Sequence, residues 1–209
     1  MTFAYEEIRF DSSGLVPVVT QDAESGEVLM VAWSNREALE ETMRTGQLTF
    51  FSRSRNRLWK KGETSGNSMR LVEMKIDCDG DTLLALVEPA GPACHTGERT
   101  CFFRSLWGEG GTDCTFWGQL WRLLQERRHA PVEKSYTARL LGEGSSRIAQ
   151  KVGEEGVETA LAVALGDREG TRYEAADLLY HLLVALVSLD LKPVDVLREL
   201  RMRHRKSPE

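Results

Sequence analysis

Short apolar blocks and one alternating segment dominate the first half of the chain, and they predict β-strands. The blocks are VLMVAW at 28–33 and LTFFSR at 48–53, and the alternating segment is VEMKID at 72–77. One helix is expected between the first two strands, because Ser34 or Asn35 can cap REALEETMR and Gly46 follows its end. Residues 1 to about 104 therefore predict a mainly β unit.

A hairpin is expected at the end of this unit. The pair Asp79-Gly80 separates VEMKID from the apolar run TLLALV at 82–87. Aspartate followed by glycine favours a tight turn between antiparallel strands. We therefore expect the two segments to pair.

In the second half, apolar residues recur every three or four positions, and this spacing predicts helices. Phe116, Leu120 and Leu124 mark the first helix, and Pro131 closes it. Ser145 or Ser146 and Pro193 are start signals for later helices. The three later helices are expected over about 145–165, 171–190 and 194–205.

The segment SLWGEGGTD at 105–113 has three glycines and no periodicity, which is typical of a linker. We place the first domain at 1–107, the linker at 108–113 and the second domain at 114–209. The expected fold is a mainly β (α+β) N-terminal domain followed by an all-α C-terminal domain.

Charge and hydropathy limit the partners and the location of the protein. A formal net charge of −5 argues against a protein built to bind nucleic acid. The start, MTFAYEEIRFDSSG, lacks the basic end and apolar stretch of a signal peptide. The run at 178–191 contains His181 and Asp190 and is too short and too polar to span a membrane. We expect a cytoplasmic protein with reduced cysteines and no membrane association.

Three cysteines of the first half form a candidate zinc site. Cys94 and Cys101 are separated by six residues in GPACHTGERTC, and Cys78 lies in the expected turn DCDGD. Thiolates suit zinc, and three protein ligands leave a position for a water whose pKa falls to about 7. Two alternatives stay open: a closed structural site with Cys114 as fourth ligand, and unrelated thiols. His95 is either a proton-transfer residue or a polar turn residue.

The aspartates around Cys78 form a second candidate metal site. Asp77, Asp79 and Asp81 place three carboxylates on one turn, and a hard cation such as magnesium or calcium would offset their repulsion. An EF-hand is rejected, because Thr82 stands where that loop needs glycine. The alternative is an acidic, solvated hairpin.

A basic loop lies between the expected strands. The segment SRSRNRLWKKGETSGN includes Arg53 and Lys60 and ends in a glycine-rich turn. Such a loop can bind phosphate through side chains and backbone N–H groups, although an ordinary exposed loop is the alternative.

Together, VLMVAWSNREAL, FFSRSRNRLWKKGETSGN, DCDGDTLL and GPACHTGERTCF resemble the phosphoribosyl-AMP cyclohydrolase family. The resemblance implies zinc ligands at Cys78, Cys94 and Cys101, in a site shared between two subunits, and magnesium ligands at Asp77, Asp79 and Asp81. It implies that zinc-activated water opens the adenine ring at N1–C6, with His95 moving protons. The implied substrate-binding residues of this half are Arg53, Trp59, Lys60, Gly62, Glu63, Thr64, Ser65 and Gly66.

Carboxylates also gather on two expected helices. Glu154, Glu155 and Glu158 project from one side of the first helix, and Glu174 and Asp177 repeat a three-residue spacing on the next. Antiparallel packing of the two helices would bring the five carboxylates onto one magnesium ion. The alternative is a solvated acidic face.

This pattern, with GSSRIAQKVGEEGVE and AADLLYHLLVAL, resembles the MazG-like nucleotide pyrophosphatases and specifically phosphoribosyl-ATP pyrophosphatase. The resemblance implies release of pyrophosphate at a magnesium site. Lys151 and Arg147 are candidate phosphate contacts, and salt bridges are their alternative role.

The two resemblances imply consecutive reactions in histidine biosynthesis. The second domain would convert phosphoribosyl-ATP to phosphoribosyl-AMP, and the first would then open the adenine ring, with Zn²⁺ and Mg²⁺ as cofactors. A homodimer is implied. Two alternatives remain: a house-cleaning nucleotide pyrophosphatase with an inactive first domain, and a zinc-stapled interaction protein.

Overall fold

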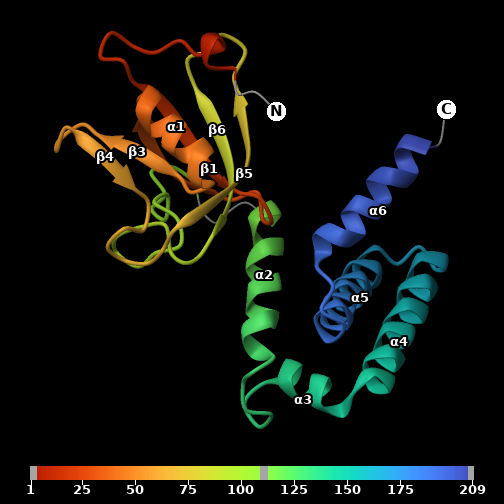
Figure 1. The fold of residues 1–209 in the computed structure, drawn as a ribbon. Coiled ribbons are helices and arrows are strands. Elements are labelled where there is room, and N and C mark those ends of the chain that lie inside the picture. Colours follow the sequence, from red (N-terminus) through yellow and green to blue (C-terminus); the bar gives the residue numbers. More distant parts are fainter. Residues whose placement is uncertain (1–3, 109–112, 207–209) are drawn as a thin grey trace. The chain divides into compact units, whose positions relative to one another are not determined.

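The computed structural model describes residues 4–108 and 113–206 (Figure 1). The chain divides into two compact units, Met1–Gly118 and Gln119–Glu209. Most of the linker expected at 108–113 lies outside the described residues, as does the side chain of Cys114. The exact domain boundaries therefore stay predictions.

Over residues 4–108 the first unit is a β unit with one α-helix, and the helix α2, Asp113–Arg127, crosses the boundary to the second unit. Strands β1 and β2 pair antiparallel, β1 and β6 pair parallel, and β5 and β6 pair antiparallel, in the order β2-β1-β6-β5. Strands β3 and β4 form a separate antiparallel pair. The elements are the short 3₁₀ helix η1 Tyr5–Glu7, β1 Val16–Asp22, β2 Val28–Ser34, α1 Arg36–Thr45, β3 Thr49–Ser52, β4 Arg57–Lys60, β5 Met69–Ile76 and β6 Leu83–Pro89.

Apolar side chains of the sheet and of α1 form one core. Val18, Leu29, Phe50 and Leu83 are fully buried, and Leu39 of α1 joins them. Every second residue of β1 is buried, as expected for a strand with one face on the core. The expected mainly β fold of this half is confirmed.

Strand β1 was missed by the sequence analysis, although it is central in the sheet. Pro17 lies within it, and proline argues against a central strand because it cannot donate a ladder hydrogen bond. The structure accommodates Pro17 near the start of β1, where the ladder with β6 has not begun; that ladder runs from Val18 to Asp22. Strand β4 was also missed, since its residues read as part of the basic loop.

Helix α1 begins and ends as expected. The side chain of Asn35 accepts a hydrogen bond from the N–H of Ala38 at 2.8 Å, and Gly46 ends the helix with a φ of 68°. These contacts satisfy backbone groups that the helix ends leave without a partner.

The connection between β5 and β6 is wider than the tight turn expected at Asp79-Gly80. Ile76 pairs with Leu83, so residues 77–82 form the loop. The carboxylate of Asp77 explains the difference, because it accepts hydrogen bonds from the N–H groups of Gly80 and Thr82 at 3.0 and 3.1 Å. The backbone is thus folded around that carboxylate.

The second unit is helical. Helices α4 and α5 pack along each other, and the short helix α3 contacts both (Figure 1). Trp121, Leu140, Ile148, Leu183 and Val187 belong to its buried core. The helices are α2 Asp113–Arg127, α3 Tyr136–Glu143, α4 Ser145–Ala164, α5 Arg168–Ser188 and α6 Pro193–Lys206. The expected all-α fold is confirmed, with α3 as an additional helix that begins at the N-cap Ser135.

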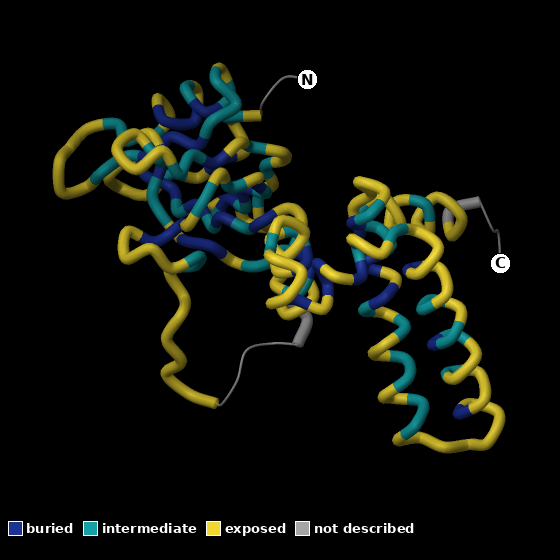
Figure 2. Tube along the Cα trace, turned by 90° about the horizontal axis from the view of Figure 1, so that it is seen from below, coloured by how far each residue is buried: buried dark blue, intermediate teal, exposed yellow. Residues whose placement is uncertain are grey.

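Many residues of the helical unit are exposed (Figure 2). On α4, α5 and α6 several of the exposed residues have large apolar side chains. They include Val157, Leu161 and Tyr173 on the first two helices and Leu197 and Leu200 on α6. The helical unit therefore exposes large apolar side chains on three of its helices. None of the helices in the described part of the chain is long and apolar enough to cross a membrane.

The cap of α1 can be tested by substitution. We expect Asn35→Ala to lower the free energy of unfolding of the first unit by about 1 kcal/mol, because the Ala38 N–H loses its partner. Asn35→Ser keeps a capping oxygen and should lose less. Urea unfolding followed by circular dichroism measures both. An equal loss in the two variants would show that the side-chain hydrogen bond contributes nothing.

Candidate metal centres and substrate pocket

Residues 93–101 fold into a turn that brings two of the candidate zinc ligands together. The N–H of Ala93 donates to the carbonyl of Arg99 at 2.9 Å, and the N–H of Cys94 donates to that of Glu98 at 3.0 Å. The N–H of Cys101 donates to the carbonyl of Leu29 in β2 at 2.8 Å. The turn is therefore attached to the sheet, and both thiols line one pocket.

The side chain of Arg99 ties the same turn to the end of the β1–β2 hairpin. Its Nε donates to Glu27 at 2.9 Å, and its terminal nitrogen bonds the buried carboxylate of Asp22. A guanidinium held by two carboxylates is a rigid, charge-assisted arrangement. Sequence reasoning did not identify this clamp.

The two thiols of the turn have pKa values shifted in opposite directions. The hydroxyl and backbone N–H of Thr96 lower the pKa of Cys94, and the Thr96 hydroxyl lies 3.1 Å from its sulfur. Desolvation raises the pKa of Cys101, and the neighbouring Cys94 raises it further. One thiolate is thus stabilised beside a second that resists ionisation, and a cation between them would favour both.

Lys61 lies beside these thiols. The sequence analysis placed it in the basic loop but selected only its neighbour Lys60 as a site residue. Lys61 is only 7% exposed, and its Nζ donates to the carbonyl of Ala93 at 2.9 Å. Burial lowers its pKa, while Cys101 and Cys94 act in the opposite direction. Lys60 is exposed. Side chains alternate between the two sides of an extended segment, so following that alternation past β4 could have separated the two lysines.

A cavity of about 440 Å³ opens beside the sulfur pair, a size suited to a small-molecule ligand. Its lining includes the predicted residues Trp59, Gly62, Glu63, Thr64, Ser65 and His95. His95 Nδ1 lies 3.9 Å from the sulfur of Cys94.

Three predicted substrate residues, Arg53, Lys60 and Gly66, lie away from this lining. The guanidinium of Arg53 stacks 3.6 Å from the centre of the Trp33 ring. Gly66 belongs to the turn after Ser65, with a φ of 77°. A neighbouring depression is lined by Arg55, Trp59 and Thr64, among others, so it adds a cationic side chain next to the cavity.

Cys78 is not brought to the other two cysteines within the chain. It is exposed in the 77–82 loop, and it is absent from the described residues that line the cavity. Among the described residues, the groups of three ligand atoms close enough to share an ion are all carboxylates. A single chain therefore presents two zinc-type ligands at one place and the third elsewhere.

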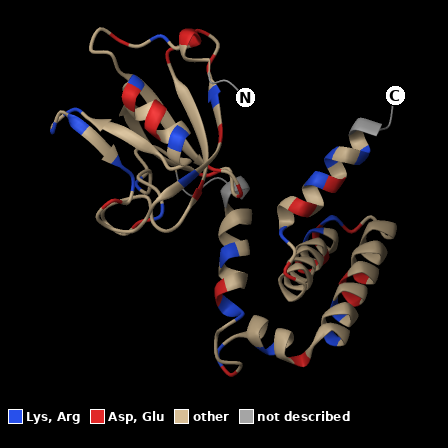
Figure 3. Cartoon of the chain, viewed as in Figure 1, with Lys and Arg blue, Asp and Glu red and all other residues tan. Residues whose placement is uncertain are grey.

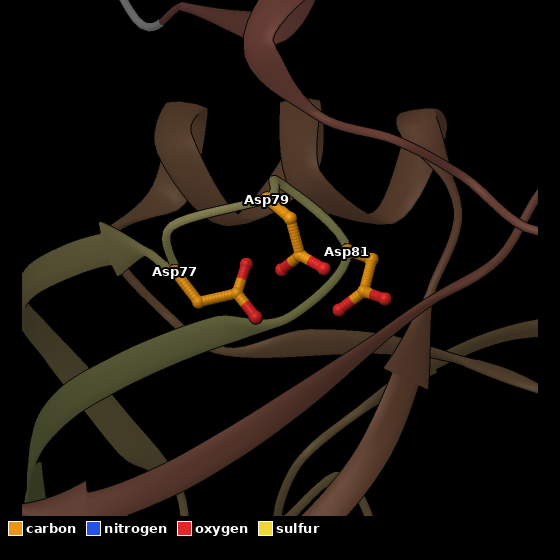
Figure 4. Close-up of side chains that lie close together, drawn as sticks. All are labelled: Asp77, Asp79 and Asp81. Carbon is orange, nitrogen blue, oxygen red and sulfur yellow. The ribbon is translucent and has the colours of Figure 1, made fainter.

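The three aspartates of the 77–82 loop lie close together (Figure 4). Ligand oxygens of Asp77, Asp79 and Asp81 are within 4.8 Å of one another, and all three residues are exposed. Desolvation would raise the pKa of Asp77, but hydrogen bonds from the N–H groups of Thr82 and Gly80 hold it below its usual value. Asp77 is thus kept ionised within an acidic group that suits a hard cation.

A second carboxylate group lies between α4 and α5. Glu155 and Glu158 of α4 and Glu174 of α5 have ligand oxygens within 4.8 Å of one another, and Figure 3 marks acidic positions along α4. Desolvation raises the pKa of Glu174, and the carboxylates of Glu158, Glu155 and Asp177 raise it further. Bringing these charges together is unfavourable, and a divalent cation would relieve the repulsion.

The other predicted residues of this site lie at its edge. Glu154 is outside the group of three, and its carboxylate pairs with Lys151 at 2.9 Å. Lys151 also pairs with Glu155 at 2.7 Å, and both bonds raise its pKa. Lys151 thus contacts carboxylates, as in the salt-bridge alternative. Asp177 is exposed on α5 and close enough to Glu174 to influence its pKa.

Comparison with known proteins relates both units to characterised families. Residues 30–103 match the family model described as phosphoribosyl-AMP cyclohydrolase, and residues 118–204 match the one described as phosphoribosyl-ATP pyrophosphohydrolase. These segments contain the sulfur pair, the aspartate loop and the α4–α5 carboxylates.

Curated relatives match almost the whole chain. The protein named histidine biosynthesis bifunctional protein HisIE from Thermus thermophilus is 54% identical over 203 residues, covering 96% of this chain and 94% of its own. Proteins of the same name from Escherichia coli O6:H1 and Pasteurella multocida are 53% and 52% identical, each over 92% of this chain and 93% or 95% of their own. The chain therefore belongs to the HisIE family of bifunctional histidine-biosynthesis hydrolases, with a phosphoribosyl-AMP cyclohydrolase domain followed by a phosphoribosyl-ATP pyrophosphohydrolase domain.

Proposed function

We propose that the two hydrolytic reactions of this bifunctional enzyme use two separate sites. The site in the C-terminal unit acts first, and the site in the N-terminal unit acts second. The α4–α5 site releases pyrophosphate from phosphoribosyl-ATP, and the cavity of the first unit then opens the adenine ring of phosphoribosyl-AMP. The observation that carries this proposal is that each unit gathers its own ligand atoms, sulfur beside the cavity and carboxylate oxygen between the helices.

The sulfur pair fits zinc, provided that a second copy of the chain supplies the third ligand. Cys94 and Cys101 share the cavity wall, whereas Cys78 is exposed in another loop. An exposed thiol in one copy can complete the pair of the other, as in a symmetric dimer where the same surfaces meet twice. The exposed apolar residues of α4, α5 and α6 also support a homodimer.

Zinc, when bound, supplies Lewis acidity and a water that ionises near neutral pH. The residues of the chain then bind the substrate and move the proton. Trp59 offers an aromatic face to the adenine, and the Gly62–Ser65 turn offers backbone N–H groups to phosphate. His95 stands beside Cys94, where its imidazole can take a proton and return it to N1 as the N1–C6 bond breaks.

Two magnesium sites complete the proposed set of cofactors. In the first unit the ligands are Asp77, Asp79 and Asp81, which already lie together. In the second unit Glu155, Glu158 and Glu174 form the centre of the site, and Glu154 and Asp177 flank it. Magnesium, when bound, neutralises charge on the phosphates. The carboxylates position it, and Lys151 keeps Glu155 in place.

Mixing two inactive variants tests the shared zinc site. Cys78→Ser and Cys101→Ser should each lose ring opening, because each chain lacks one zinc ligand. When the two variants are unfolded together and refolded, some dimers contain one chain of each kind. In such a mixed dimer one of the two zinc sites has all three cysteines, and the other site lacks two of them. With half of the dimers mixed, about a quarter of wild-type ring-opening activity should return.

The matched control for this experiment is Cys114→Ser, which should keep one zinc per chain by metal analysis. If the mixture stays inactive, the three cysteines do not combine across two copies. If Cys114→Ser loses the zinc instead, the closed structural site with a fourth cysteine is the better explanation. Retained zinc with no ring opening in the wild-type protein would favour the house-cleaning pyrophosphatase.

A single substitution should separate the two activities. Glu158→Gln removes a charged oxygen from the α4–α5 group, and we expect pyrophosphate release to fall by about 100-fold or more. Ring opening of added phosphoribosyl-AMP should be unchanged. The control is Glu169→Gln on α5, because Glu169 is exposed and its carboxylate pairs with Arg172, away from the carboxylate group. Equal loss of both activities in Glu158→Gln would argue against independent sites.

A further inference from the structure

His181 is a buried histidine that is not a ligand in any of the three proposed metal sites, and both of its ring nitrogens have partners. It lies on α5 and is 5% exposed. Its Nδ1 lies 2.9 Å from the backbone carbonyl of Asp177, and its Nε2 lies 3.1 Å from the hydroxyl of Tyr136 on α3. Both ring nitrogens therefore have partners, which defines the orientation of the ring.

These partners also define which nitrogen carries the proton. A backbone carbonyl only accepts hydrogen bonds, so Nδ1 must donate to Asp177. In the neutral ring Nε2 then accepts from the Tyr136 hydroxyl. The Tyr180 ring packs edge-on at 5.2 Å between centres, and the Tyr136 ring does so at 6.1 Å. The imidazole is thus held in one tautomer and one position.

The N–H edge of this ring faces a carboxylate of the proposed magnesium site. His181 Nδ1 lies 3.7 Å from Oε1 of Glu155. The same oxygen lies 2.7 Å from the Nζ of Lys151, and Glu155 is itself only 5% exposed. A buried carboxylate is oriented by its protein partners because little water reaches it. Lys151 and His181 are the cationic and N–H groups that the structure places at this oxygen.

We propose that His181 is a positioning residue for pyrophosphate release. From its place on α5, where it bonds the Asp177 carbonyl, His181 contacts Tyr136 of α3 and Glu155 of α4. It thereby fixes Glu155 relative to the carboxylates of α5. Protein partners of metal-binding side chains orient those side chains and affect metal affinity by about 10- to 100-fold. This inference rests on the proposed magnesium site, and it assigns His181 no contact with the substrate.

Two near-isosteric variants separate the two nitrogens. In His181→Asn the amide N–H₂ can take the place of Nδ1, which keeps a donor towards Asp177 and Glu155. In His181→Gln the amide reaches the place of Nε2, which keeps the Tyr136 contact and loses the donor at Nδ1. We expect His181→Gln to raise the magnesium concentration needed for half-maximal pyrophosphate release by about 10-fold or more, and His181→Asn by less than about threefold.

The effect should fall on metal binding more than on turnover. At saturating magnesium, kcat of His181→Gln should stay within about threefold of wild type. A second readout is direct binding of Mn²⁺, followed by electron paramagnetic resonance in the full-length protein. Mn²⁺ bound by the wild-type protein but not by Glu155→Gln is assigned to the α4–α5 site. The affinity of this site for Mn²⁺ should be lower in His181→Gln than in the wild-type protein.

Matched controls separate positioning from simple packing. Tyr180→Phe removes a hydroxyl that pairs with Thr137 at 2.8 Å and leaves both nitrogens of His181 with their partners, so its metal affinity should equal that of wild type. Tyr136→Phe removes the hydroxyl at Nε2 and should weaken metal binding by a few fold. Far-UV circular dichroism reports whether the helical unit of each variant is folded.

The outcomes distinguish a failure of the positioning role of His181 from a failure of the proposed α4–α5 magnesium site. If Glu155→Gln binds Mn²⁺ and responds to magnesium as wild type does, the proposed site itself is wrong. If Glu155→Gln loses both while every His181 variant behaves as wild type, the site stands and the positioning role is overturned. A lower unfolding midpoint of His181→Gln with unchanged metal affinity would also overturn it, because it would show a structural role alone.

Discussion

Repulsion between the ligand groups is the constraint on which the rest of this structure depends. The candidate metal ligands carry like charge and lie close together, and this repulsion contributes to the shifts in their pKa values. Desolvation and neighbouring carboxylates raise the pKa of Glu174, and desolvation with the nearby Cys94 raises that of Cys101. The fold must therefore supply compensating contacts around each group. In the proposed function, bound cations complete that compensation.

The two units meet this constraint in different ways. In the first unit the compensation comes from loops: Arg99 clamps the cysteine turn to acidic residues, and backbone N–H groups hold Asp77. In the second unit it comes from side chains on packed helices, with Lys151 and His181 both facing Glu155. In the proposed function, the loops shape a cavity for the planar adenine ring, and the two packed helices hold carboxylates for the flexible polyphosphate.

Much of the fold could be predicted because hydrophobic periodicity and caps act locally. The apolar block of β2 and the Asn35 and Gly46 caps of α1 are visible in the sequence, and so are the long helices α4 and α5. Strand β1 could not be predicted because it contains Pro17, which argues against a central strand. Pro17 is tolerated because the pairing of β1 with β6 begins only at Val18. Local signals cannot report such long-range pairing.

The candidate sites show the same limit more sharply. Residue types and motifs pointed to the cysteines, the aspartate loop and the α4 glutamates, and the structure brings most of each set together. Sequence spacing could not rank Glu154 against Glu155, which differ because only Glu155 turns into the buried α4–α5 face. It also did not single out Lys61 and Arg99, whose roles depend on contacts with residues about 32 and 72 positions away.

Joining the two units in one chain has a consequence for the proposed dimer. In the proposed dimer the first unit takes its third sulfur ligand from a second copy, and the second unit exposes apolar side chains on three helices. Once either unit associates, the chain connection turns the other association into an intramolecular event with a high effective concentration. Each interface can then be weaker than it would need to be in a separate protein. Zinc binding and the packing of the helical units would consequently support each other, although neither site borrows a ligand from the other unit.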